Sequence, residues 1–242
     1  MKYYIGTSGW HYDHWRVRFY PEKLPKTKWL EFYAARFNTV ELNNSFYRLP
    51  SEAAFTNWRD SSPADFTFSV KVSRLITHFK KLRDTGETVG KFIARVRLLG
   101  DKLGPLLYQL PPDMRRDDEL LDLFLSTLPR DIEHVFEFRH RSWLEEGVLG
   151  ILHNYNAGFC IFDMPSLSCP LVVTADFAYI RFHGSTGLYR SSYSDEKLAT
   201  WAGRVANLAQ ELKAVYIYFN NDAEAFAVTN ALTLRSFLEA EK

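Results

Sequence analysis

Eight short runs rich in β-branched and aromatic residues recur along the 242-residue chain, and most of them are followed by a segment with helical periodicity. The runs cover residues 3–7, 39–43, 66–72, 104–110, 134–138, 158–163, 178–183 and 215–220. Alternating strands and helices favour a parallel sheet, because parallel strands need long crossover connections. Eight such units in a chain of this length predict a closed TIM (β/α)8 barrel.

The helical stripes lie between these runs. Apolar residues repeat at steps of three and four in five segments, 29–37, 89–99, 120–128, 143–152 and 226–238, and most clearly at Leu198, Trp201, Val205, Leu208 and Leu212. Ser142 and Glu145 have the spacing of a capping box, which predicts a helix that begins just after the fifth run.

The sixth unit departs from this pattern. Pro165 and Pro170 lie between the sixth and seventh runs and leave too little uninterrupted chain for a normal crossover helix. We therefore expect an irregular sixth βα unit, with a loop or a short helical turn. Because no internal repeat, low-complexity segment or linker divides the chain, we predict a single domain over residues 1–242.

Charge and composition exclude several classes of protein. With 30 basic and 29 acidic side chains the net charge is +1, which argues against a protein that coats duplex nucleic acid through its overall field. The sequence has no apolar run of about 18 residues and no room for a signal peptide at its start, so we expect a cytoplasmic protein with no membrane partner. Cys160 and Cys169 match neither a redox pair nor a zinc site. Neither a cofactor nor an oligomeric state follows from the composition.

Catalytic groups of a TIM barrel come from the carboxyl ends of its strands. Seven of the eight runs end in titratable or amide side chains. Because strand side chains alternate between faces, three pairs each project to one side: Glu41 with Asn43, Glu137 with Arg139, and Arg181 with His183. If that side is the interior, the pairs converge at one mouth. A polar layer that merely closes the top of the barrel is the alternative, equally weighted for any single residue.

Ordered motifs along nearly the whole chain resemble the YecE-like family, a domain of unknown function (domain of unknown function 72). They are GTSGW (6–10), FYP (19–21), FNTVELNN (37–44), FYRLP (46–50), ITH (76–78), QLPP (109–112), EFRH (137–140) with SW (142–143), RFHG (181–184) and YFNND (218–222). The resemblance implies a TIM barrel but no agreed reaction. Val17 and Ala225 stand where the family usually has glycine, so we expect both loops to be shaped differently here.

The leading hypothesis is an enzyme, with hydrolase as the predicted class, that acts on a small polar or anionic substrate such as a sugar or phosphate ester. Glu137 and His183 are the predicted proton-transfer pair, because both groups can be tuned toward neutral pH. Glu41 is the second carboxylate, which with Glu137 would suit glycoside cleavage at a separation of about 5 to 9 Å. The predicted substrate-binding residues are Lys71, Arg139, Arg181, Asn43, Gln109, Asn220, Trp10 and Tyr47.

A divalent metal is a less favoured version of the same hypothesis. The candidate ligands are Glu137, Asp163, His183 and Asp222. Arg139 and Arg181 weigh against a metal, because fixed cations repel it.

Single-stranded nucleic-acid binding or processing is the alternative function. Its basis is a set of loop aromatics interleaved with arginines: Trp10, Tyr12, Trp15, Tyr47, Trp143, Tyr189 and Tyr193, beside Arg16, Arg18, Arg48, Arg141 and Arg190. The same aromatics can simply pack the loops onto the barrel. Nucleotide-binding glycine motifs and a Gly-x-Ser-x-Gly elbow do not occur.

Overall fold

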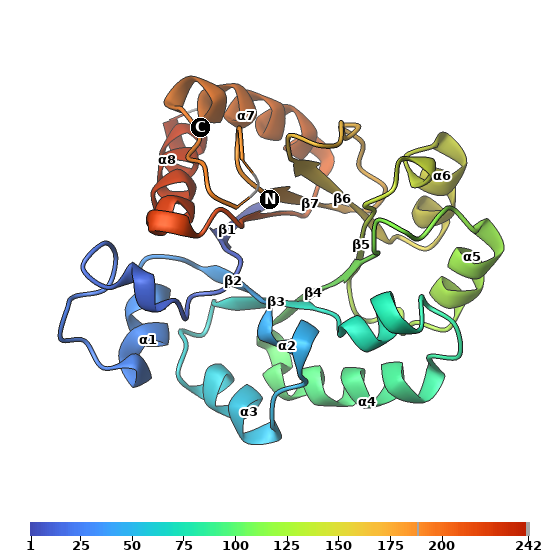
Figure 1. Cartoon of the computed structure of the whole chain (residues 1–242), viewed down its shortest axis with the longest axis horizontal. Coiled ribbons are helices and arrows are strands. Elements are labelled where there is room, and N and C mark those ends of the chain that lie inside the picture. The colour runs from blue at the N-terminus through green and yellow to red at the C-terminus, as the bar shows by residue number, and fades with distance from the viewer. Residues whose placement is uncertain (188, 241–242) are drawn as a thin grey trace.

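The computed structural model describes residues 1–187 and 189–240. Its centre is one parallel sheet with the strand order β1-β8-β7-β6-β5-β4-β3-β2 (Figure 1). The strands are β1 (Lys2–Thr7), β2 (Thr39–Leu42), β3 (Thr67–Lys71), β4 (Leu103–Gln109), β5 (His134–Glu137), β6 (Gly158–Asp163), β7 (Phe177–Phe182) and β8 (Ala214–Phe219). Each predicted run is confirmed to within one residue at either end.

The ring closes between β1 and β2. A parallel bridge pairs Ser8 with Glu41, just beyond the end of β1. The two strands come so close that a Cβ on Gly6 would lie 2.3 Å from the carbonyl oxygen of Thr39, so only glycine fits at this position. The Tyr33 hydroxyl donates to the same carbonyl at 3.1 Å and accepts from the Thr7 amide at 2.9 Å. The predicted TIM barrel is thus confirmed.

Helices surround the strands in Figure 1, with α1 on one side, α3 and α4 below, α5 and α6 opposite α1, and α7 and α8 above. Their bounds are α1 (Trp29–Ala34), α2 (Asn44–Tyr47), α3 (Glu52–Asp60), α4 (Gly86–Val96), α5 (Asp118–Ser126), α6 (Glu146–Asn154), α7 (Asp195–Leu208) and α8 (Phe226–Ala240). None of the helices within the described ranges is long and apolar enough to cross a membrane.

The helices match the prediction from the sequence in most units and differ from it at α2 and α3 and at the start of α6. The connection from β6 to β7 carries no helix in residues 164–176, as Pro165 and Pro170 predict. The short helices α2 and α3, which have no strong stripe, were not predicted. The capping box was wrong: α6 begins at Glu146, and the Ser142 hydroxyl instead accepts from the backbone amide of Arg116 at 2.9 Å.

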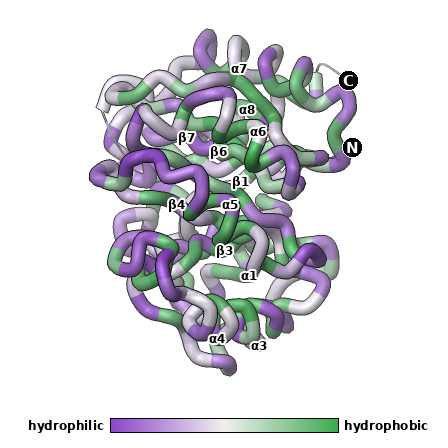
Figure 2. Tube along the Cα trace, turned by 90° about the vertical axis from the view of Figure 1, so that its right-hand side faces the viewer, coloured by the Kyte–Doolittle hydropathy of each residue, from purple (hydrophilic) through white to green (hydrophobic). Residues whose placement is uncertain are grey.

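The barrel interior changes character along its axis. Its lower part is an apolar and aromatic cluster that includes Leu107, Val135, Phe177 and Tyr216. Figure 2 shows the same contrast for the whole chain, with hydrophobic residues concentrated in the strands and hydrophilic residues in the loops. The strands continue upward from this cluster into the polar residues at their carboxyl ends. Because this part of the interior is apolar, the carboxyl ends of the strands are where a polar ligand can enter.

Val17 and Ala225 lie in two loops that dock on each other at the carboxyl end of the barrel. The Trp15 indole donates to the carbonyl of Asp222 at 2.9 Å, and Arg18 forms an ion pair with Glu224. Val17 has φ +67° and Ala225 has φ +60°, the left-handed region that glycine favours. The expectation of differently shaped loops is therefore wrong at these two positions. Both adopt a backbone conformation suited to glycine, and Val17 and Ala225 are strained in it because they carry a Cβ atom.

We predict that Val17→Gly stabilises the protein. Val17 is 75% exposed, so little packing is lost, while relief of a left-handed β-branched residue gains about 1 kcal/mol. For a chain of this size that raises Tm by about 2–4 °C, measurable by differential scanning calorimetry. Ala199→Gly on the exposed face of α7 is the matched control and should cost about 1 kcal/mol. A Val17→Gly protein no more stable than the parent would contradict the assigned strain.

Candidate active site at the barrel mouth

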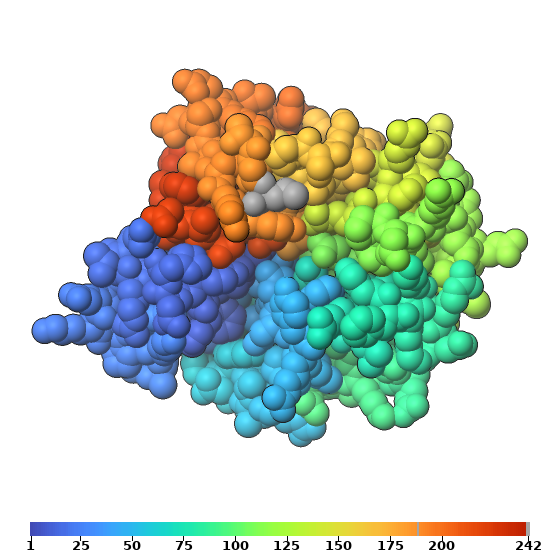
Figure 3. Space-filling view, in the orientation of Figure 1, coloured from blue at the N-terminus to red at the C-terminus, as the bar shows by residue number. Residues whose placement is uncertain are grey.

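Strand alternation brings one face of β7 into the barrel. Tyr179, Arg181 and His183 lie two residues apart along this strand, so their side chains point the same way. The Tyr179 hydroxyl is 2.9 Å from that of Ser69 on β3, which fixes this face as the inner one. Arg181 is therefore in the middle of the barrel and His183 is nearer its mouth. Figure 3 shows segments from all parts of the chain around the centre of one face.

Arg181 holds two buried carboxylates at once. Its Nη2 donates to Oε1 of Glu41 at 2.7 Å, and its Nη1 donates to Oε2 of Glu137 at 2.5 Å. All three side chains have no solvent exposure. Glu41 also accepts from the hydroxyls of Ser8 and Tyr179, each at 2.7 Å. We call Glu41, Arg181 and Glu137 the inner network; it connects β2, β7 and β5.

The inner network is ionised at neutral pH. Burial by itself would raise the pKa of Glu41 and Glu137, but the neighbouring arginines and hydrogen bonds outweigh burial and lower both. Burial would likewise lower the pKa of Arg181, yet the two carboxylates raise it well above its usual value. Arg181 balances one of the two carboxylate charges, and Arg139, which also pairs with Glu137, balances the other.

A second layer of polar groups lies on the mouth side of Glu137. Arg139 pairs with Oε1 of Glu137, and the Gln109 amide donates to the same oxygen at 2.8 Å. Nη2 of Arg139 is 3.0 Å from Nε2 of His183, whose Nδ1 is 3.2 Å from the Asn220 amide. Because a guanidinium only donates, the imidazole accepts this bond and is neutral. Burial accordingly lowers the pKa of His183 to about 4.

Lys71 and Asn43 complete the mouth from the neighbouring strands β3 and β2. Nζ of Lys71 lies over the Phe46 ring, 4.1 Å from its centroid. Within the described part of the chain no carboxylate oxygen comes within 4.0 Å of this ammonium group. Burial, followed by the charge of Arg181, lowers the pKa of Lys71 to about 8. Oδ1 of Asn43 is buried with no hydrogen-bond partner among the described residues.

The expected proton-transfer pair is not tuned as predicted. Glu137 and His183 are neighbours, with Oε1 and Nε2 3.6 Å apart, but the pKa of each moves below neutrality rather than toward it. Two arginines hold Glu137 as a carboxylate, and burial keeps His183 neutral. The pKa of Lys71, which was predicted only as a charge for binding, is instead lowered toward neutrality, to about 8.

Glu41 and Glu137 are not arranged as a glycosidase pair. Such a pair needs one carboxylic acid with a raised pKa and a second group facing the bond to be cleaved. Here both pKa values are lowered, and both carboxylates face the same guanidinium. Arg181 occupies the space between them that a sugar would need.

The side chains of Trp10 and Tyr47 form no hydrogen bond with the mouth layers among the described residues, although the Tyr47 ring lies 5.1 Å from that of Phe46. Trp10 is buried against the edge of Trp58, and its carbonyl accepts from the Tyr20 hydroxyl at 2.6 Å. Tyr47 is 68% exposed, with the guanidinium of Arg74 5.5 Å from its ring centre. Of the other loop aromatics, Trp15, Trp143 and Tyr193 are buried, whereas Tyr189 is 40% exposed. Most of the predicted stacking surface therefore packs the loops onto the barrel.

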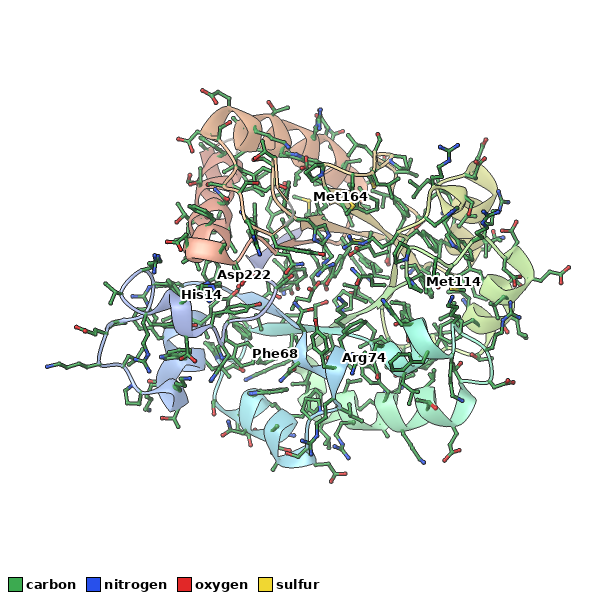
Figure 4. All side chains as sticks on the ribbon, viewed as in Figure 1. His14, Phe68, Arg74, Met114, Met164 and Asp222 are labelled. Carbon is green, nitrogen blue, oxygen red and sulfur yellow. The ribbon has the colours of Figure 1, made fainter. Side chains whose placement is uncertain are left out.

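The four candidate metal ligands are dispersed. Asp222 lies beside His14, with a carboxylate-to-imidazole distance of 3.5 Å (Figure 4). Asp163 accepts from the Tyr193 hydroxyl, Lys197 and the Trp201 indole at 3.0–3.1 Å. Glu137 and His183 stay in the mouth layers. In the ranges that the structure describes, no group of three or more metal-ligating residues is assembled.

Two neighbours of the site, Ser8 and Tyr179, were missed from the sequence, and a third, His78, was left undecided. Ser8 and Tyr179 bind Glu41, and His78 faces the Phe46 ring with its centre 4.9 Å away. Tyr179 has a usable signal, because it lies two residues before Arg181 on the same strand face. From the sequence, His78 could equally join the mouth or tie down its loop; in the structure it is half-buried near the charge of Lys71.

The family described as "Protein of unknown function DUF72" matches residues 4–242. The chain belongs to the DUF72 family. The UPF0759 protein YunF of Bacillus subtilis is 28% identical over 273 residues, which is 98% of this chain and 95% of YunF. The UPF0759 protein YecE of Escherichia coli is 32% identical over 145 residues, which is 60% of this chain and 51% of YecE. The predicted YecE-like membership is thus confirmed.

Solved DUF72 structures share the architecture. A DUF72 protein of Thermotoga maritima has a TM-score of 0.90 and 32% identity, covering 99% of this chain and 100% of its own. A DUF72 protein of Enterococcus faecalis has a TM-score of 0.85 and 21% identity over 98% and 95% of the two chains. A xylanase of Clostridium acetobutylicum has a TM-score of 0.51 and 11% identity over 98% of this chain and 71% of its own, a likeness of fold alone.

Arg181→Met should strongly destabilise this DUF72 protein. The change leaves Glu41 and Glu137 buried without their shared cation, which costs about 3–5 kcal/mol in urea unfolding. Arg139→Met is the control, because Glu137 keeps Arg181 and Gln109, and we expect a loss of about 1–2 kcal/mol. Adding Glu137→Gln to Arg181→Met should recover part of the loss. Equal costs for the two arginines would contradict the central role of Arg181.

Lys71→Met should stabilise the protein at neutral pH. The pKa of Lys71 is about 8 in the folded chain and about 10.4 in the unfolded chain, so the cost of the buried charge is fully present below pH 8. This cost disappears as pH rises from 8 to about 10.4, because in that range the unfolded state holds the proton and the folded state does not. We expect the variant to be about 3 kcal/mol more stable at pH 7 and the difference to vanish near pH 10.5. A difference independent of pH, in urea unfolding, would refute the lowered pKa.

Proposed function

We propose that this DUF72 chain is a cytoplasmic enzyme that binds a small polar or anionic substrate, such as a sugar or phosphate ester, at the barrel mouth and acts on it by acid/base chemistry. One observation carries the proposal. The mouth layers and inner network hold two carboxylates, Glu41 and Glu137, against three cations, and the surplus cation is Lys71 without a counter-ion among the described residues.

The remaining groups suit the recognition of such a substrate. Arg139 is 11% exposed and its guanidinium borders the mouth, where it can hold a phosphate or carboxylate. Asn43 offers a buried acceptor for a hydroxyl group. Gln109 and Asn220 fix the orientation of Glu137 and His183 rather than facing open space. The proposed binding groups are therefore Lys71, Arg139 and Asn43, held by a rigid layer beneath them.

The proton-transfer step falls to Lys71 in this proposal. A general base works best when its pKa lies near the working pH, and the pKa of Lys71 is about 8. The oxygens of Glu137 already accept bonds from Arg139, Arg181 and Gln109. Because neither buried carboxylate is free to activate water, the predicted hydrolase activity is not part of the proposal.

Thermal shift with inorganic phosphate and small sugar phosphates tests the proposal. At about 100 times its dissociation constant, a ligand should raise Tm by about 5 °C for a chain of this size. Arg139→Met should weaken binding about tenfold or more, because it removes charge-assisted hydrogen bonds. The affinity should fall as pH rises past about 8, where Lys71 loses its charge.

Three outcomes separate the alternatives. Lys197→Met, which removes a surface cation paired with Asp163, is the control and should bind like the parent protein. A shift produced by short oligonucleotides alone, and lost at moderate salt, would favour the nucleic-acid function. Phosphate affinity that is equal in Arg139→Met and in the parent would overturn the proposed binding site.

A further inference from the structure

Lys71 differs from other lysines of the chain in the surroundings of its amine. Lys213 lies 3.0 Å from Glu133 and 3.1 Å from Asp176, and Lys197 lies 3.0 Å from Asp163. The amine of Lys71 instead contacts the face of Phe46, which is 8% exposed. The carboxylates nearest to it in the barrel, Glu41 and Glu137, are engaged by arginines. An amine in such a place is easier to deprotonate than one beside a carboxylate.

Two physical causes make this amine nucleophilic near neutral pH. Burial desolvates it, and the charges of Arg181 and Arg139 act on it in the same direction and together with burial outweigh those of Glu137 and Glu41; desolvation and neighbouring cations are the two ways in which proteins activate a lysine. With a pKa of about 8, roughly a tenth of the molecules carry the free amine at pH 7. The charged groups that act on Lys71 are Arg181, Glu137, Glu41 and Arg139, and those that act on its neighbour His78 are Lys71, Asp113, Arg139 and Arg74.

We infer that Nζ of Lys71 forms a Schiff base with the aldehyde or ketone carbon of a small anionic substrate whose phosphate or carboxylate binds Arg139. This inference rests on the proposed function and specifies its substrate class, a carbonyl compound that bears an anion. Lys71 is then a catalytic residue that bonds to substrate, in addition to a charge that attracts it.

The step balances without any further reagent. The lone pair of the free amine attacks the carbonyl carbon, a C–N bond forms, and the electrons of the C=O π bond move to oxygen, which takes up a proton while nitrogen releases one. A second proton then converts this hydroxyl to water, which leaves as the nitrogen lone pair forms the C=N bond, and the resulting iminium releases that proton again to give the imine. Amine and carbonyl thus give imine and water, with no oxidation or reduction.

Two neighbours suit the proton movements of this step. Burial, and then the charge of Lys71, lowers the pKa of His78, so its imidazole is neutral and can take up a proton. Nδ1 of His78 is 2.9 Å from the Thr77 hydroxyl, which orients the ring. Asn43 follows β2 directly beside Lys71 at the end of β3, and its free Oδ1 can accept from the hydroxyl of the intermediate.

Reductive trapping tests the inference. The full-length protein is incubated with glycolaldehyde phosphate and sodium cyanoborohydride, which reduces the imine to a stable secondary amine, and peptides are mapped by mass spectrometry. We expect labelling of Lys71 at least about tenfold faster than of Lys213 at pH 7, with a rate that rises with pH and levels off above about 8. Inorganic phosphate should protect Lys71.

Matched variants separate the nucleophile from the anion site. Lys71→Arg keeps the charge and should abolish the fast label, whereas Lys213→Arg should leave it unchanged. Arg139→Met should slow labelling by glycolaldehyde phosphate about tenfold but not labelling by uncharged glycolaldehyde. Lys71 labelling no faster than that of Lys213, in a protein that phosphate still stabilises, overturns the Schiff base and leaves the proposed function standing. Equal rates with the two aldehydes and no stabilisation by phosphate overturn the anionic substrate itself.

Discussion

The buried guanidinium of Arg181 is the group on which the arrangement of the rest of this barrel depends. It lies where water is excluded and holds Glu41 and Glu137 through its two terminal nitrogens. A charge in such a place is tolerated only when it is paired and hydrogen-bonded. The strands that carry Arg181 and its partners, β7, β2 and β5, therefore need a fixed register relative to one another. Ser8 on the closing bridge and Tyr179 across the barrel complete this arrangement. The geometry of the mouth follows from satisfying these buried groups.

The two polar layers have different roles: the inner network supports the barrel, and the mouth carries the groups proposed for binding and catalysis. The inner network has saturated carboxylates and pKa values far from neutral, which suits a rigid support. At the mouth, Lys71 has no carboxylate within ion-pair distance and Oδ1 of Asn43 has no hydrogen-bond partner among the described residues. Their placement costs stability without an evident structural return, which is typical of groups kept for binding or catalysis.

Most of the architecture could be predicted from local patterns, because strand and helix periods are strong signals. The alternation that pairs Arg181 with His183 and Glu41 with Asn43 also placed these residues on the inner face correctly. Their protonation could not be predicted, since it depends on contacts among β2, β5 and β7 that are far apart in the sequence. Ser142 illustrates the opposite failure: its spacing to Glu145 is right for a cap, but a tertiary bond to Arg116 takes its hydroxyl.

The order of Arg181 and its partners along the chain matters for how the protein is made. During synthesis from the N-terminus, Glu41 and Glu137 emerge before Arg181, and β1 waits for β8 at the other end of the chain. Until β7 arrives Glu41 lacks its arginine and Glu137 has only Arg139, so the interior has to stay hydrated. Water then leaves the barrel interior, the sheet closes and the site assembles in one late cooperative event. A ribosome-bound or truncated chain that ends before β7 exposes unfinished hydrophobic surface, which chaperones and proteases recognise.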